Sequence, residues 1–140
     1  MKSKEKDNII FIRLFKDEEL NKNIKEVCKK HNIKTAVVLS GIGQFKSVKL
    51  GFFKEKGDYR PQELKNPLEL LSLSGNICSD EEGHLLHLHA VMGDEEKRAI
   101  GGHLIDGTIS VTAEIVLLKT DIDVKREDDE ETGLKSLFLE

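Results

Sequence analysis

The chain has 140 residues, of which 38% are hydrophobic and 34% are charged, and its formal net charge is −4. These values are typical of one cytoplasmic domain, and they exclude an overall attraction to DNA phosphate or to an acidic membrane surface. The sequence lacks a stretch near the ~20 apolar residues of a membrane span, a secretory signal, a C-x-x-C zinc motif and a disulfide framework.

The first seven residues, MKSKEKD, are charged and are expected to be flexible, and a single domain is expected over residues 8–140. The β-branched and aromatic stretch Asn8–Phe15 predicts a strand. Apolar residues then recur at the spacing of one helix face. We therefore expect a helix over Glu18–Lys30, with Asp17 as its N-terminal cap.

Most of the remaining chain has the pattern of strands joined by short polar links. The expected strands are Thr35–Ser40, Ser47–Phe53, Leu68–Ile77, Leu85–Met92 and Thr108–Lys119. Between them we expect a break at Gly41–Gly43, an irregular segment at residues 59–67 and a solvated acidic loop at residues 126–131, with a last short element at Leu134–Leu139. Short links favour antiparallel pairing, so the predicted fold class is α+β, a mostly antiparallel β-sheet with one main helix packed on it.

The most informative pattern is a His-x-His pair in one of these strands. Because side chains alternate between the faces of a strand, His87 and His89 point to one side and the apolar residues between them point to the core. His103 follows the step Gly101-Gly102, where missing side chains allow the returning chain to approach closely. Three imidazoles meeting at one point would hold a zinc ion and leave its fourth position open to water or a small ligand.

Two alternatives stay open for this histidine set. Imidazole also binds nickel, copper and iron(II), so the sequence favours zinc without excluding those ions. A His-x-His pair also occurs on exposed faces of sheets that bind no metal. The sequence therefore predicts a site by its donors and their spacing, and not by a metal-specific motif.

Glu69 and Glu114 are the candidate catalytic residues, because each lies within an otherwise apolar strand. Burial there would raise the pKa of the carboxyl group and suit it to carry protons for a reaction at the metal. The alternative is that each carboxylate pairs with a lysine or faces solvent.

Four segments, taken together, resemble a known family. They are NPLELLSLSGN at Asn66–Asn76, HLLHLHA at His84–Ala90, GGHL at Gly101–Leu104 and TAEIVL at Thr112–Leu117. In this order they resemble the plants and prokaryotes conserved (PPC) domain, also described as a predicted DNA-binding protein with a PD1-like motif. The resemblance runs from about Ile9 to Leu139.

The resemblance implies a sheet flanked by a helix and an assembly of three identical chains. It also implies that His87, His89 and His103 correspond to the three histidines of prokaryotic members, which look like metal ligands. The fold is similar to that of acetolactate decarboxylase, which is an analogy of fold and establishes no activity. Plant members carry Arg-Gly-Arg motifs for the DNA minor groove, and here every arginine is isolated.

Two functions follow from these observations. The first is a metal-dependent hydrolase or lyase acting on a small molecule, because a metal-bound water has a pKa near ~7 and a metal can polarise a carbonyl. The second is a DNA-binding or regulatory oligomer in which the metal is structural or absent. Its electrostatic support is a loose group of four lysines, Lys46, Lys49, Lys54 and Lys56.

Overall fold

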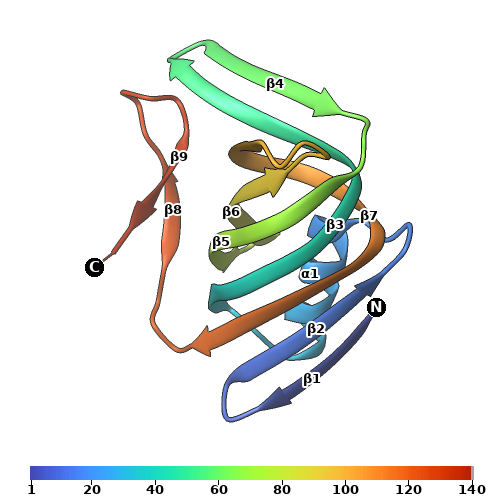
Figure 1. Ribbon diagram of the computed structural model, residues 1–140. Helices are drawn as coiled ribbons and strands as arrows, with labels where there is room; N and C mark the ends of the chain where they lie inside the picture. Colours follow the sequence, from blue (N-terminus) through green and yellow to red (C-terminus); the bar gives the residue numbers. More distant parts are fainter. Residues whose placement is uncertain (140) are drawn as a thin grey trace.

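The computed structural model describes residues 1–139 and consists of one helix packed on a curved antiparallel sheet (Figure 1). The helix α1 spans Leu20–Lys30. The strands are β1 (Lys2–Lys6), β2 (Ile9–Phe15), β3 (Thr35–Glu55), β4 (Asp58–Leu64), β5 (Leu68–Asp80), β6 (Gly83–Gly93), β7 (Ala99–Thr120), β8 (Lys125–Asp128) and β9 (Lys135–Phe138).

The first seven strands form one sheet in the order β1-β2-β7-β6-β5-β3-β4, and β7 also pairs with β3. Because β7 contacts both β6 and β3, the pairs β3–β5, β5–β6, β6–β7 and β7–β3 close a ring of four strands. Every pairing is antiparallel. The last two strands form a separate hairpin.

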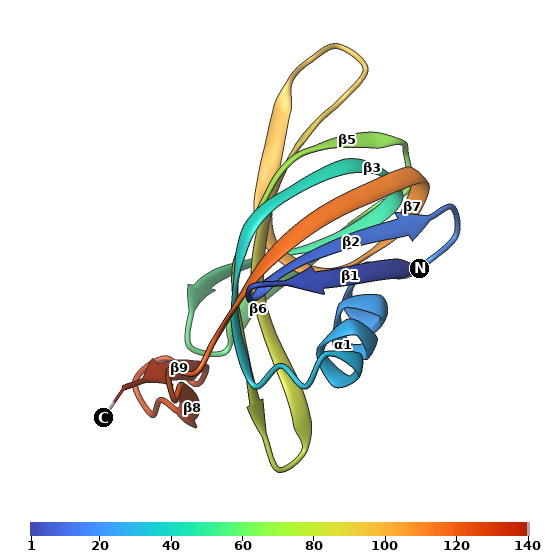
Figure 2. The same cartoon turned by 90° about the horizontal axis from the view of Figure 1, so that it is seen from below.

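The helix lies on one side of the sheet, and the β8–β9 hairpin lies apart from the helix (Figure 2). Four buried side chains of α1, Leu20, Ile24, Val27 and Cys28, join the aliphatic core. Alternate residues of β2, β6 and β7 supply the opposite wall of that core. The predicted fold class, α+β with one helix on a mostly antiparallel sheet, is confirmed. Within residues 1–139, the one helix falls short of the length and apolarity needed to cross a membrane.

Three local predictions differ from the structure in the central strands and the helix. β3 continues through Gly41–Gly43, because bulges let it change register against β7 where a break was expected. Residues 59–67 were expected to be irregular, but β4 pairs with β3, with Pro61 on a sheet edge where no partner needs its missing N–H. The helix begins at Leu20, and Asp17 pairs with Lys46 and does not cap it.

Both ends of the chain are more ordered than the sequence predicted. Residues 1–7 were expected to be flexible, but Lys2–Lys6 pair along their length with β2, and the N-terminal amine binds the Glu18 carboxylate. The acidic run 126–131 was expected to be a solvated loop, but its first residues form β8 and pair with β9. Charged side chains can occupy these edge strands because their outward faces contact water.

Candidate metal centre

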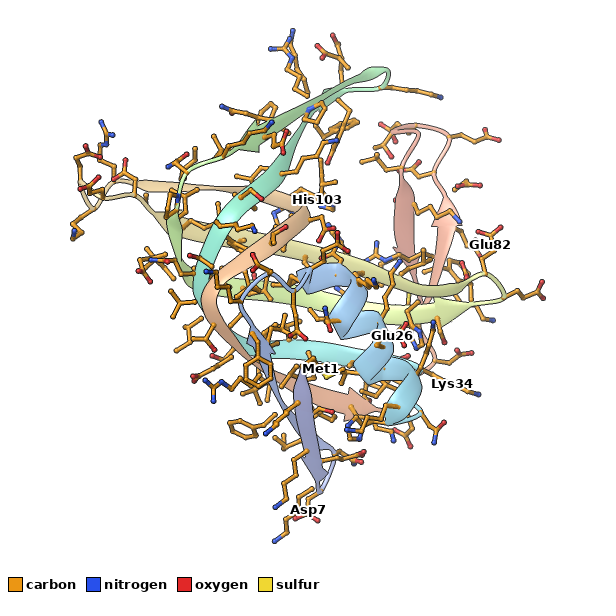
Figure 3. All side chains as sticks on the ribbon, turned by 90° about the vertical axis from the view of Figure 1, so that its right-hand side faces the viewer. Met1, Asp7, Glu26, Lys34, Glu82 and His103 are labelled. Carbon is orange, nitrogen blue, oxygen red and sulfur yellow. The ribbon has the colours of Figure 1, made fainter. Side chains whose placement is uncertain are left out.

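The three histidines lie on two neighbouring strands of the sheet. His87 and His89 project from one face of β6, while Leu88 and Ala90 between and beside them are buried on the other face. His103 is the register partner of His89 on β7. Their convergence follows from strand alternation and from antiparallel pairing, and Figure 3 shows His103 near the middle of the molecule beside these strands.

The spacing of the ring nitrogens fits one tetrahedral ion. One nitrogen from each ring lies within 4.8 Å of the others, and among residues 1–139 this is the one such cluster of metal-binding side chains. Nε2 of His87 and Nε2 of His89 are 3.3 Å apart. Two nitrogens bound to zinc at about 2.0–2.1 Å lie about 3.3–3.4 Å apart in tetrahedral geometry. The donor set therefore fits zinc without rearrangement of the strands.

The surroundings of the cluster favour neutral imidazoles. Burial lowers the pKa of His87 below its ordinary value, and the positive charge of Arg126 and the other two imidazoles lower it further. Burial also lowers the pKa of His103, with smaller contributions from His89 and Arg126. A neutral imidazole has the free lone pair that a metal ion requires, so the lowered pKa values favour the charge state that can bind a metal near neutral pH.

The histidines line a cavity of about 640 Å³ between the sheet and the C-terminal hairpin. Its walls come from β3, β4, β6, β7 and the β8–β9 hairpin. Apart from two glycines, the side chains that line it are Phe52, Phe53, Tyr59, Leu85, Leu86, His87, His89, His103, Arg126, Leu134 and Lys135. Most of this lining is apolar, as is typical of sites that bind small organic molecules.

Arg126 is the cationic group nearest the histidines. Its guanidinium donates to Oδ1 of Asn76 at 2.8 Å, to the backbone carbonyl of Lys135 at 3.0 Å and to Nδ1 of His87 at 3.0 Å. Arginine has no acceptor, so Nδ1 of His87 must accept and the ring proton must lie on Nε2. A metal ion on Nε2 requires the opposite tautomer, with the proton on Nδ1. The arginine contact and metal binding through Nε2 therefore exclude each other.

The family model of the Plants and Prokaryotes Conserved (PCC) domain, the PPC domain named above, matches residues 1–121. The chain belongs to this family. The predicted resemblance is thus confirmed, and the match includes the three histidines of the PPC domain but ends before the β8–β9 hairpin.

Curated relatives of this PPC domain are much longer proteins. The chain is 31% identical over 131 residues to the bifunctional protein GlmU of Synechococcus sp. strain JA-2-3B'a(2-13). It is 32% identical over 131 residues to the GlmU of strain JA-3-3Ab. The match covers 92% of this chain and 20% of each relative, so the chain spans about a fifth of their length.

Three solved structures of similar shape carry different descriptions. A metal-containing protein of Archaeoglobus fulgidus has a TM-score of 0.84 at 30% identity, over 96% of this chain and 95% of that one. A candidate DNA-binding protein of Bacteroides thetaiotaomicron has a TM-score of 0.92 at 26% identity. The match covers 99% of this chain and 96% of that one. A Staphylococcus aureus protein similar to α-acetolactate decarboxylase shares the fold alone, with a TM-score of 0.55 at 15% identity over 86% of this chain and 54% of that one.

The two carboxylates predicted to be catalytic lie outside the histidine cavity of the PPC domain. The expected burial is wrong, because Glu69 and Glu114 are both exposed on the outer face of the sheet while their strand neighbours, such as Leu70 and Ala113, are buried. Glu69 accepts a hydrogen bond from Gln44 at 2.7 Å. Glu114 lines a different hollow. Their catalytic role stays a prediction that this placement does not support.

Sequence reasoning missed Tyr59 as a residue of the site. Its ring lies edge-on to His103, with ring centroids 6.4 Å apart. Gly51 leaves room for it, since a Cβ on that residue would lie 1.8 Å from the tyrosine hydroxyl oxygen. Burial raises the pKa of Tyr59, which keeps the hydroxyl protonated as a hydrogen-bond donor. The available signal was a glycine diagonal to an aromatic residue on paired strands, since Gly51 pairs with Pro61 and Tyr59 is two residues before Pro61, and it is visible once the register of β3 and β4 is known.

Proposed function

We propose that this PPC domain binds one zinc ion through His87, His89 and His103 and presents it to a small molecule in the adjoining cavity. The observation that carries the proposal is the 3.3 Å separation of two Nε2 atoms, which matches ligands on a single tetrahedral ion. The Archaeoglobus fulgidus relative, described as metal-containing, supports it at 30% identity. Three protein ligands leave the fourth position for water or for the small molecule.

The reaction class that suits this arrangement is hydrolysis or carbon–carbon bond cleavage. Zinc supplies Lewis acidity, which polarises a substrate carbonyl or makes a water molecule more acidic. Phe52, Leu85 and Leu134 give the cavity apolar walls, against which the hydrocarbon part of a small molecule can pack beside the metal. Tyr59, beside His103, can donate a hydrogen bond to a bound oxygen atom.

We also propose that the chain assembles as a homotrimer. Several large apolar side chains are exposed on the outer face of the sheet, among them Phe11, Leu39, Ile42 and Val111. Such a face is typical of contact surfaces between subunits. The number of three comes from the family resemblance, and light scattering coupled to size-exclusion chromatography measures it directly.

Metal analysis tests the zinc proposal. The full-length chain, purified without a tag and without chelator, is expected to hold about one zinc ion per chain, and the double variant His87→Ala, His89→Ala is expected to hold none. His31→Ala is the matched control, since His31 binds Ser3 and Glu5 outside the cluster. Equal metal content in the double variant and the unaltered chain would overturn the proposal.

DNA binding is the second candidate function. It is favoured by the description of the Bacteroides thetaiotaomicron relative as a candidate DNA-binding protein. The lysines that the sequence singled out are largely engaged, since Lys46 binds Asp17, Lys54 binds Asp58 and Lys56 binds the carbonyl of Glu130. A titration with duplex DNA at low and moderate salt tests this candidate, because phosphate contacts produce a steep salt dependence.

A further inference from the structure

The charge of the histidine cavity is opposite to that of the whole chain. Among the residues that line it, Arg126 and Lys135 are cationic and none is an aspartate or glutamate. The chain carries 26 acidic residues, and eight of its last 20 are acidic, so acidic groups are abundant close by in the sequence. A cationic wall within an acidic protein selects for an anion in the cavity.

Arg126 has no carboxylate partner within residues 1–139. Arg60 binds Asp58 within β4, and Arg98 binds Asp94 in the link between β6 and β7. Arg126 is half-buried instead, and its three hydrogen bonds go to an amide oxygen, a backbone carbonyl and His87. Its Nε is buried without a hydrogen-bond partner. A half-buried guanidinium without a counterion is costly, so an anion that entered the cavity would gain a strong partner.

Metal binding would free this guanidinium for a ligand. With Nε2 of His87 on a metal ion, Nδ1 carries the ring proton and can no longer accept from Arg126. Two donors would then face each other, and the NH2 group of Arg126 would have to find another acceptor. The cavity supplies no carboxylate for that purpose, so the available acceptors are water and an oxygen atom of a ligand, and an anionic ligand oxygen is the stronger of the two.

We propose that the histidine cavity binds a small organic carboxylate, held by Arg126 with Lys135 beside it. The apolar body of this ligand would pack against Phe52, Tyr59 and Leu134, next to the metal ion. The position of the reacting end of the ligand rests on the proposed zinc site. The position of its anionic end rests on Arg126 and Lys135 alone.

A carboxylate suits this cavity better than a phosphate. A single guanidinium can bind both oxygens of a planar carboxylate in parallel. Phosphate sites commonly add a helix N-terminus or a run of backbone N–H groups, and the one helix within residues 1–139 does not line this cavity. The mostly apolar walls also favour a singly charged ligand with a hydrocarbon body.

Two matched pairs of probes test the inference, benzoate against benzamide and hexanoate against hexanamide. Each is titrated into the full-length chain, with zinc and after zinc removal, by calorimetry or by NMR shifts. We expect at least one carboxylate to bind about tenfold or more tightly than its amide. Because zinc itself attracts carboxylates, the deciding comparison is Arg126→Gln, which should lose about tenfold or more of the carboxylate affinity while its affinity for the amide is unchanged.

Three further variants control this experiment. Arg126→Lys keeps the charge and should retain part of the carboxylate affinity, and Lys135→Gln should weaken it by less than Arg126→Gln does. Arg98→Gln removes an arginine that is bound to Asp94 outside the cavity, so it should change nothing. Thermal unfolding of each variant establishes that the hairpin substitutions leave the domain folded.

The outcomes separate this inference from the zinc proposal. Two outcomes overturn the inference and leave the zinc site standing. In the first, the chain binds zinc but binds neither carboxylate more tightly than its amide. In the second, the chain binds zinc and Arg126→Gln has the same carboxylate affinity as the unaltered chain. Arg126-dependent carboxylate binding by a chain that takes up no zinc supports the inference and overturns the zinc proposal. Failure of both carboxylates to bind in either state overturns the inference.

Discussion

The two sides of the histidine cavity are built in different ways. The sheet side carries His87, His89 and His103 on strands whose opposite face is buried, as the zero exposure of Leu88 illustrates. The hairpin side carries Arg126 and the β9 residues, which pair within the hairpin and are exposed along β9. Only the sheet side is fixed by the core.

This difference separates two tasks. A metal ion tolerates small errors in ligand position poorly, so its ligands belong on elements with locked neighbours. A ligand of variable shape is served better by an element with few buried contacts, which opens at a lower free energy than the core does. The hairpin reaches the sheet through hydrogen bonds of Arg126 to Asn76 and His87, so the residue that would recognise the ligand is also the one that docks the hairpin.

The largest effect is expected where the sheet side has no room to adjust. A Cβ at Gly75 would lie 2.0 Å from the carbonyl oxygen of His87, and the φ angle of Gly75 is +142°. Gly75→Ala should therefore lower the free energy of unfolding by about 3 kcal/mol or more and weaken zinc binding, because β6 must shift at His87. Urea unfolding and a zinc titration measure the two effects.

Gly83→Ala is the matched control for this substitution. Gly83 has a similar φ of +132°, but a Cβ there would meet nothing within 4 Å. It should cost about 1–2 kcal/mol from backbone strain alone and leave zinc binding unchanged. Equal losses in the two variants would mean that close packing of β5 against β6 does not position His87.

The sheet side was largely predictable from the sequence, and the hairpin side was not. Alternation along one strand placed His87 and His89 together, and the Gly-Gly step located the return of His103 to their side. Arg126 reaches His87 across 39 residues of chain. Local periodicity in the sequence cannot predict such a long-range contact, because the contact depends on how the hairpin packs against the sheet.

The wrong expectation that Glu69 and Glu114 are buried has a physical origin in the same alternation rule. A strand is buried on both faces only when other parts of the protein cover both faces of its sheet. Within one chain, the outer face of this sheet is exposed to solvent at Glu69 and Glu114. The alternation that places His87 outward also places these carboxylates outward from buried neighbours such as Leu70 and Ala113. The sequence identified which residues share a face, but not which face the rest of the protein covers.

A smaller effect is expected from removing the charge on the hairpin side. Arg126→Gln should raise the affinity for zinc about three- to tenfold, because it removes a positive charge near the metal ligands and a donor that holds His87 in the wrong tautomer. Competition with a coloured chelator measures the change, with Arg98→Gln as the control. A fall in zinc affinity would instead mean that Arg126 positions His87 for the metal.

The smallest effect is expected in the pH dependence of stability after zinc removal. Burial, with the charge of Arg126 as a lesser cause, lowers the pKa values of His87 and His103 in the folded protein, whereas in the unfolded chain both groups take up protons as the pH falls through about 6.5. Below that pH the unfolded state binds more protons than the folded state does. The free energy of unfolding should therefore fall as the pH falls from about 6.5 through the folded pKa values, and stay level above it.

Substitutions on each side of the cavity separate the causes of this slope, which is the fall in the free energy of unfolding as the pH falls below about 6.5. His87→Ala with His103→Ala should largely remove it, because both groups that resist protonation are gone. Arg126→Gln should only reduce it, since burial is the larger cause and remains. Urea midpoints measured between about pH 8 and pH 5 avoid the range in which carboxylates titrate. If the histidine substitutions leave the pH dependence of stability unchanged, its origin lies outside the cavity. If Arg126→Gln removes the whole pH dependence, the charge of the hairpin is its main cause, and burial by the sheet is not.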